Sequence, residues 1–267
     1  MKTADFHNDA LTSGKSISLL ELSRKTVKCV CAVYAGARTF EEVRKIVALF
    51  EREKAAGTFL SLEDAYYLDE GNIEEVCGWS PVCVSLTWNA GNALAGGCLS
   101  DDGLSARGKQ IVRILAAHGI AVDCAHLNAR SFFDVAQETP YLVNSHTCLN
   151  AVHRHPRNID DAQAALLSEY KGLIGITFVG KFLTDGKAKP EDVFRHTDYC
   201  VQKFGRDCVC FGTDFFGTED LPIGLRDYTE EGMGKLFSLF VKAGYSLEDI
   251  HKIFVGNLSD FLSKNIN

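Results

Sequence analysis

Histidine and carboxylate side chains stand in this chain at spacings that suit a divalent metal ion. His7 and Asp9 lie two residues apart at the end of a short extended run near the start of the sequence. Residues two apart on a β-strand point to the same face, so this imidazole and this carboxylate would aim at one point. Glu63, His126 and His146 each close a further apolar, strand-like run. Three imidazoles and two carboxylates make a nitrogen and oxygen donor set suited to zinc or a similar ion.

The number of candidate ligands favours two ions over one. A single catalytic zinc binds three protein ligands and keeps an open position, so five ligands exceed its needs. Two divalent ions that share a bridging carboxylate use the set better, and Zn²⁺ is the preferred identity. We expect Glu63 to bridge, with His7 and Asp9 on one ion and His126 and His146 on the other. A single histidine at a strand end is more often a hydrogen-bonded loop residue, and only the shared position of all five makes a metal site the better interpretation.

The elements that must position these side chains alternate between strand and helix periodicity. Strand-like runs are expected at Ala4–Asp9, Val27–Tyr34, Thr58–Glu63, Val82–Trp88, Ile120–His126, Tyr141–His146, Leu173–Val179 and Cys208–Phe215. Helical patterns are expected at Thr39–Lys54, Leu104–His118, Ala129–Gln137, Asp160–Tyr170, Glu191–Phe204, Glu230–Ala243 and Ser246–Lys264. Strands alternating with amphipathic helices indicate βαβ units, and eight of them fit a closed α/β barrel of the (β/α)8 TIM type. We expect one domain over residues 1–267, with the extra C-terminal helix packed across the outside.

Two further polar residues lie where barrel enzymes build their active sites. Asp214 follows the eighth expected strand in a glycine-rich turn, where a carboxylate can touch a metal-bound water and carry its proton; capping that turn is the alternative. Arg157 follows the sixth strand, and a guanidinium there can grip a substrate carboxylate; a solvated basic loop is the alternative. Three more histidines lie in helical patterns, are expected at the surface, and are given no role: His118, His196 and His251.

Composition limits the classes of partner and the compartment. The net charge is −7 and no basic stripe is present, which argues against nucleic acid as a partner. Met1 lies only a few residues before the first strand and no apolar run reaches spanning length, so we expect a cytoplasmic protein with no membrane partner. The ten cysteines are then expected to be reduced. Cys29 with Cys31, and Cys208 with Cys210, each share a strand face; a soft metal site is one interpretation, but filling of the core is the better one.

Taken in order along the chain, several segments resemble the membrane (renal) dipeptidase family of zinc metallopeptidases, which have amidohydrolase-like barrels. These segments are Asp5–Asp9, Leu60–Glu63, Val84–Asn89, Gly103–Gly108, Val122–His126, Asn144–His146, Arg157–Asn158, Phe211–Gly217 and Gly256–Leu258. The resemblance implies a (β/α)8 barrel, two zinc ions and hydrolysis of dipeptides by a metal-bridging hydroxide. By motif position it implies first-ion ligands at His7 and Asp9, a bridge at Glu63 and second-ion ligands at His126 and His146. It also implies that Asp214 lies near the bridging water and that Arg157 binds substrate.

The chain departs from the family pattern mainly at residues that would face the substrate. Trp88 stands where the family commonly has a histidine thought to steady the carbonyl oxygen of the scissile bond, and loss of one such donor costs roughly a hundredfold in rate. Phe182 aligns with a tyrosine that often helps to bind substrate. Phe216 replaces a common second acid, and Asp64 replaces the glycine that commonly follows the bridging residue.

These departures leave three functions open. The first is a dipeptidase; the second is a related hydrolase of another small amide, lactam or cyclic compound, for which an apolar Trp88 and Phe182 pocket would be suited. The third is a barrel that binds metal without useful catalysis. A dipeptide or another small molecule is the expected partner in each case. Relatives are often dimers, so a homodimer is an option, although no patch in the sequence identifies an interface.

Overall fold

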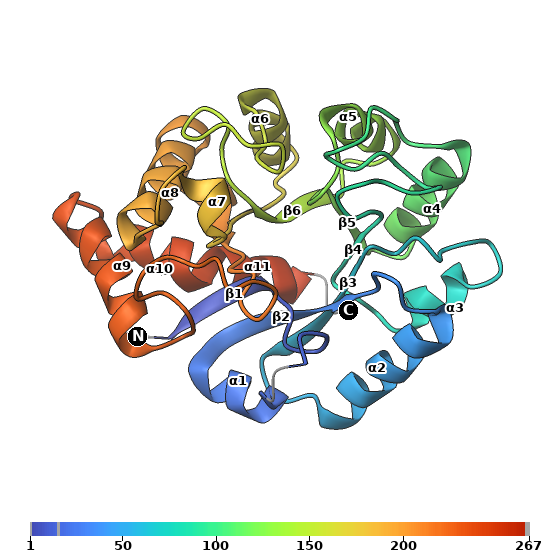
Figure 1. Cartoon of the computed structure of the whole chain (residues 1–267), viewed down its shortest axis with the longest axis horizontal. Helices are drawn as coiled ribbons and strands as arrows, with labels where there is room; N and C mark the ends of the chain where they lie inside the picture. The colour runs from blue at the N-terminus through green and yellow to red at the C-terminus, as the bar shows by residue number, and fades with distance from the viewer. Residues whose placement is uncertain (1, 15–16, 265–267) are drawn as a thin grey trace.

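Eight parallel strands follow one another around a barrel in chain order, in a computed structural model that describes residues 2–14 and 17–264 (Figure 1). The strands are β1 (Thr3–Asn8), β2 (Thr26–Tyr34), β3 (Thr58–Glu63), β4 (Cys83–Ser85), β5 (Ala121–Asp123), β6 (Leu142–Thr147), β7 (Ile174–Ile176) and β8 (Val209–Phe211). The seam between β1 and the segment after β8 is joined at the mouth. There, the Asp214 N–H donates to the His7 carbonyl and the Asp9 N–H to the Phe215 carbonyl, each over 3.0 Å. The prediction of a single-domain (β/α)8 barrel is confirmed.

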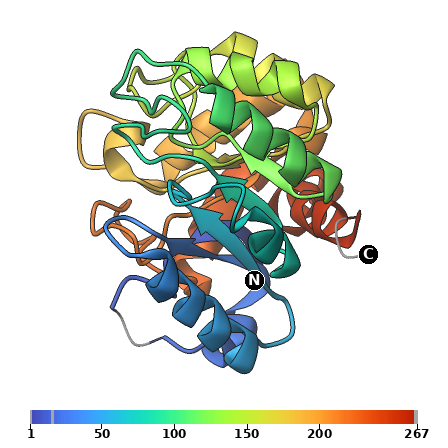
Figure 2. The same cartoon turned by 90° about the vertical axis from the view of Figure 1, so that its right-hand side faces the viewer.

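Helices follow the strands and surround the barrel (Figures 1 and 2). They are α1 (Leu19–Lys25), α2 (Phe40–Glu53), α3 (Ile73–Gly78), α4 (Ala106–Ala117), α5 (Ala129–Glu138), α6 (Asp161–Glu169), α7 (Gly180–Leu183), α8 (Pro190–Phe204), α9 (Glu230–Lys242), α10 (Leu247–His251) and α11 (Asn257–Lys264). Local sequence sets their starts: Thr39 and Glu42 form a capping box at α2, and Pro190 opens α8. Helices α1, α3 and α7 were not predicted, because they are too short to show a helical period.

Four of the eight strands are shorter than the sequence predicts. β4, β5, β7 and β8 have three residues each. The apolar runs continue past the paired residues, but the chain then turns into the loops of the mouth. His126 and Asp214 have φ values of 70° and 61°, a left-handed conformation that cannot continue a strand. These two side chains therefore stand on loops just beyond β5 and β8.

The C-terminal segment closes one end of the barrel, which corrects the prediction that it packs across the outside as one helix. It is broken into α10, a π-helical turn (Lys252–Gly256) and α11. Phe261 of α11 lies 5.4 Å from the Phe6 ring, between centroids, and packs with residues that open the strands, such as Val82 and Ala121. Without α11, this end of the barrel would expose apolar side chains to water. Packing α11 over them buries that apolar surface, which is more favourable than placing α11 in the outer layer of helices. In Figure 2 this end carries the red C-terminal helix.

The prediction of a surface position for His196 is also wrong. This side chain is fully buried on α8, where its Nδ1 accepts from the Leu149 N–H over 3.1 Å and its Nε2 lies 3.1 Å from the Leu183 carbonyl. His118 and His251 are exposed, as predicted.

Cysteines mostly fill the core, as the sequence suggested. Cys29, Cys31 and Cys208 belong to the main apolar cluster, and Cys210 to the cluster at the closed end. Across the described ranges, no helix combines the length and the apolar character needed to cross a bilayer.

Candidate metal centre

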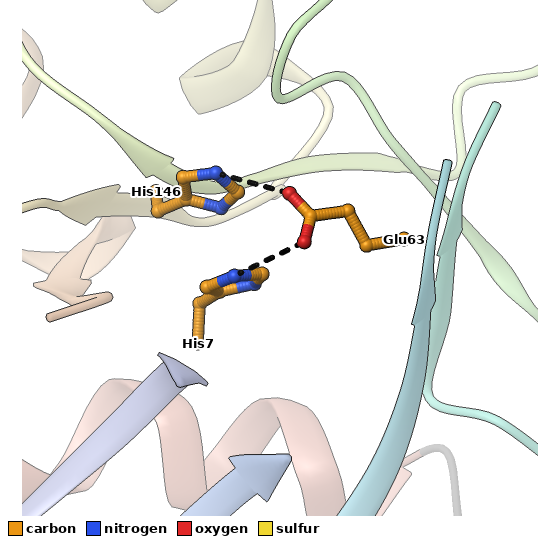
Figure 3. A group of neighbouring side chains, drawn as sticks. All are labelled: His7, Glu63 and His146. Atoms are coloured by element: carbon orange, nitrogen blue, oxygen red, sulfur yellow. Dashed lines mark ion pairs between the residues drawn. The ribbon is translucent and has the colours of Figure 1, made fainter. Parts of the chain in front are cut away.

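The five predicted ligands meet at the mouth of the barrel around the carboxylate of Glu63. Figure 3 shows Glu63 between His7 and His146. Glu63, the last residue of β3, directs Oε2 toward His7 Nε2, 3.7 Å away. Its Oε1 lies 2.8 Å from His126 Nε2 and 3.6 Å from His146 Nε2. Asp9 Oδ2 lies 3.7 Å from His7 Nε2. The two oxygens of Glu63 are thus divided between His7 on one side and His126 with His146 on the other; its role as a bridging ligand stays a prediction.

Neighbouring side chains orient the imidazoles of His126 and His146. His126 Nδ1 lies 2.9 Å from Asn89 Oδ1, and because an amide oxygen only accepts, Nδ1 must carry the proton. His146 Nδ1 lies 2.8 Å from Ser145 Oγ. Burial lowers the pKa of both imidazoles well below the usual range, and the positive charge of Arg157 adds to this. Both rings are therefore neutral at pH 7, the form that binds a metal.

The acceptor atoms face one another in a way that calls for a cation or a proton between them. His126 Nε2, left without a proton by the bond to Asn89, is 2.8 Å from Glu63 Oε1 and 2.9 Å from His146 Nε2. Lone pairs at these separations repel unless a positive centre lies between them. His7 Nε2 is a buried atom with no hydrogen-bond partner in the described part of the chain. These donors fit divalent metal ions.

A second group of ligand atoms forms beside His7. Asp214 Oδ1 lies 3.8 Å from His7 Nε2, and the three ligand atoms of His7, Asp9 and Asp214 are mutually within 4.8 Å. Gly217 packs directly on the two carboxylates, because a Cβ at this position would lie 2.1 Å from Asp9 Oδ2 and 2.6 Å from Asp214 Oδ1. The absence of a side chain at Gly217 is therefore what allows the turn after β8 to cover Asp9.

Crowded carboxylates shift the pKa values on this side of the centre. Burial raises the pKa of Asp214 to about 8, with the charge of Asp9 adding to the effect. Burial also raises the pKa of Glu63 well above its usual range. For His7, burial disfavours the charged ring, but the negative charges of Glu63, Asp9 and Asp214 outweigh it and raise its pKa to about 10. The site thus strongly favours bound positive charge.

Arg157 lies in the wall behind His146 and is almost fully buried. Its Nη2 donates to the His146 carbonyl over 3.2 Å, its guanidinium lies 5.4 Å from the Phe182 ring centroid, and its Nε has no hydrogen-bond partner in the described ranges. Phe182 is itself buried, with the His155 ring 4.5 Å away. Phe182 is therefore placed to support Arg157, and its expected contact with substrate stays a prediction.

Trp88 stands at the rim of the mouth, three residues beyond β4. Its indole is 43% exposed, and its centroid lies 5.9 Å from that of His126 and 5.7 Å from that of Tyr34. Asp64, which replaces a common glycine, has a φ of 57°, a conformation that glycine adopts without strain and aspartate tolerates.

Sequence reasoning missed four residues that shape this site: Asn89, Ser145, Gly217 and Tyr34. Ser145 adjoins a predicted ligand and Asn89 and Gly217 lie within the motif segments, so a search for polar or small neighbours of the ligands would have found these three. Tyr34 ends a predicted strand and could have been found in the same way as Glu63.

Comparison with known proteins agrees with this geometry. The family model "Membrane dipeptidase (Peptidase family M19)" matches residues 6–264. A protein of Klebsiella pneumoniae described as "Uncharacterized protein in pqqA 5'region" is 30% identical over 161 residues, and the match spans only 58% of each chain.

Solved structures share the fold over nearly the whole chain. An amidohydrolase from Pseudomonas aeruginosa has a TM-score of 0.86 at 20% identity, covering 99% of this chain and 96% of that one. The dipeptidase AC, a metallopeptidase of family M19, has a TM-score of 0.85 at 20% sequence identity, and the match covers 99% of this chain and 98% of that one. A metallopeptidase from Rhodobacter sphaeroides, liganded with a phosphinate mimic of the dipeptide L-Ala-D-Ala, has a TM-score of 0.80 at 21% sequence identity, and the match covers 99% of both chains. With the family model matched over nearly its full length, this chain belongs to the membrane dipeptidase family, peptidase family M19.

Proposed function

We propose that the protein is a metal-dependent dipeptidase whose mouth holds two divalent ions, with zinc the preferred identity. The proposed ligands are His7, Asp9, Glu63, His126 and His146. The observation that carries the proposal is the division of the Glu63 carboxylate, with Oε2 toward His7 and Oε1 toward His146 (Figure 3) and toward His126. Membership of family M19 supports the same activity.

Each remaining polar group has a place in this chemistry. When bound, such ions would supply a shared hydroxide as nucleophile at neutral pH. Asp214 stands beside His7 and Asp9, where its carboxylate can accept a proton from the nucleophile and return it to the leaving amine. Arg157, with Nε unpaired, is placed to bind the carboxylate of the C-terminal residue of the substrate. These roles for Asp214 and Arg157 are part of the proposal.

The test combines metal analysis with a dipeptide panel. Purified, zinc-loaded protein is expected to hold about two ions per chain and to cleave dipeptides at neutral pH, as two-metal hydrolases do. Glu63→Gln is expected to lose both metal and activity, whereas Glu138→Gln is expected to keep them, since Glu138 pairs with Lys109 and Arg113 on the outer helices. Failure to cleave any dipeptide, while an authentic family member does so in parallel, would refute the proposal.

Trp88 favours a second candidate, hydrolysis of a less polar amide, lactam or cyclic compound. Its exposed indole gives the mouth an apolar surface and offers only one N–H donor. The substitution Trp88→His separates the candidates, because a gain in dipeptide turnover is expected only if the indole redirects specificity. Metal binding without turnover of any substrate would instead favour a barrel with impaired catalysis.

A further inference from the structure

Two aromatic rings form a continuous surface on one side of the barrel mouth. Tyr34 is the last residue of β2, and its ring centroid lies 5.7 Å from that of Trp88 beyond β4. Trp88 in turn lies 5.9 Å from the ring of His126, a proposed metal ligand. The indole keeps 43% of its surface exposed although it stands next to a buried site. An aromatic face left open at such a position gains free energy when an apolar group covers it.

Tyr34 belongs to the site as much as Trp88 does. It is paired in register with Glu63 on the neighbouring strand. Burial raises the pKa of Tyr34 to about 12, and the nearby charges of Asp64, Glu63 and Asp9 add to the effect. The phenol is therefore uncharged at pH 7, so the pair offers two aromatic rings, one hydroxyl and one indole N–H, with no charge of its own.

The order of the strands fixes which part of a substrate meets this surface. In an eight-stranded barrel in chain order, β2 lies across the mouth from β6. Arg157 follows β6 and is proposed to bind the substrate carboxylate, while Glu63 marks where the scissile bond lies. A dipeptide held at these two points directs its N-terminal residue toward Tyr34 on β2, and the indole of Trp88 extends that surface, since its centroid lies 5.7 Å from the Tyr34 ring.

We propose that Tyr34 and Trp88 form a specificity wall that selects dipeptides with an aromatic or large aliphatic N-terminal side chain. The inference rests on the proposed function. Covering a phenyl ring of the substrate should raise kcat/KM about tenfold or more over a methyl side chain, since a large apolar side chain loses most of its contact with water there.

Kinetics on a matched series test the wall. Zinc-loaded protein is assayed with Ala-Ala, Leu-Ala and Phe-Ala, which differ only in the N-terminal side chain. Phe-Ala is expected to be preferred over Ala-Ala by about tenfold or more, and this ratio is expected to collapse toward one in Trp88→Ala and to fall in Tyr34→Ala. Phe133→Ala, which removes a 36% exposed ring from the outer helix α5, is the matched control and should leave the ratio unchanged.

A binding measurement keeps the inference testable without turnover. The sequence has two tryptophans, so Trp79→Phe leaves Trp88 as the only indole. Phosphinate analogues of Phe-Ala and Ala-Ala are titrated while the fluorescence of Trp88 is followed. The Phe analogue is expected to bind about tenfold tighter and to shift the emission. Calorimetry measures the affinities of both analogues for Trp88→Ala, which lacks the fluorescent probe. In this variant the difference in affinity between the Phe-Ala and Ala-Ala analogues should be lost.

The outcomes separate this inference from the proposed function. If Ala-Ala and Phe-Ala are cleaved equally well, or if the preference for Phe-Ala persists in both Trp88→Ala and Tyr34→Ala, the specificity wall is refuted and the dipeptidase activity is still supported. If no dipeptide is cleaved but the Phe-Ala analogue binds preferentially and this preference depends on Trp88, the specificity wall is supported and the dipeptidase activity is refuted. Equal binding of both analogues, or binding of neither, overturns the wall.

Discussion

Replacing Gly217 by alanine is expected to weaken metal binding at the mouth without unfolding the barrel. The added Cβ would lie 2.1 Å from Asp9 Oδ2, and a normal separation is at least 3.0 Å, so one of the two must move by about 0.9 Å. The backbone at Gly217 does not have a positive φ, so alanine introduces no conformational strain of its own. The effect of the substitution is therefore confined to the contact with the two carboxylates.

The size of the effect follows from how little a metal site tolerates displacement. Metal–ligand distances stay within about 0.2 Å of their preferred values, so a shift several times larger removes Asp9 as a ligand. Disturbing even the outer partners of a ligand costs about 10- to 100-fold in affinity, and a misplacement of 1 Å costs about 100-fold in rate. We expect metal affinity to fall at least tenfold and kcat/KM about a hundredfold, with about 1–3 kcal/mol lost from the free energy of unfolding.

Competition with a chelator, followed by metal analysis and a dipeptide assay, measures both effects. Gly234→Ala is the matched control: a Cβ there meets nothing within 4 Å, and alanine within α9 should add up to about 1 kcal/mol of stability. Wild-type metal affinity and kcat/KM in Gly217→Ala would refute the assignment of Asp9 as a ligand held under this turn.

Three further outcomes are expected. Asn89→Ala removes the acceptor that orients His126, so affinity for zinc should fall about 10- to 100-fold in chelator competition, and unchanged affinity would contradict that role. Burial lowers the pKa of His196 to about 4, so the unfolded chain binds a proton at this position first as pH falls below about 6.5. The contribution of His196 to the free energy of unfolding should therefore decline by about 3 kcal/mol between pH 6.5 and 4, and in urea unfolding the wild type should lose about that much more stability over this range than His196→Gln. Phe261→Ala should cost about 3 kcal/mol in urea unfolding, against under about 0.5 kcal/mol for the control Leu247→Ala, which trims a side chain that is 71% exposed.

The barrel, and the meeting of the candidate ligands at its mouth, could be predicted from the sequence because each depends on a local pattern. Alternating periods locate strands and helices, and the carboxyl ends of parallel strands meet at one mouth, so His7, Glu63 and His146 could be brought together without coordinates. His196 shares a helical face with the apolar residues Val193 and Cys200, which indicates burial, whereas the polarity of histidine favours the surface. The prediction of a surface position followed the polarity and was wrong. Its two hydrogen-bond partners come from other segments and leave no signature in α8.

Contacts between distant segments could not be predicted in this way. The approach of Gly217 to Asp9 joins residues about two hundred positions apart, and glycine there has no local sign of its purpose. The closure of the barrel by α11 depends on the shape of the open end, which no periodicity encodes.

The seam at the mouth has a consequence for how the protein is made. His7 and Asp9 are bonded through their backbones to the turn that begins at Asp214, so the end of the first strand is held only once the turn after the eighth strand has been made. A chain interrupted before that turn lacks Asp214 and cannot complete the group of side chains that His7 and Asp9 form with it. Assembly of the candidate metal centre therefore requires that synthesis has passed the eighth strand.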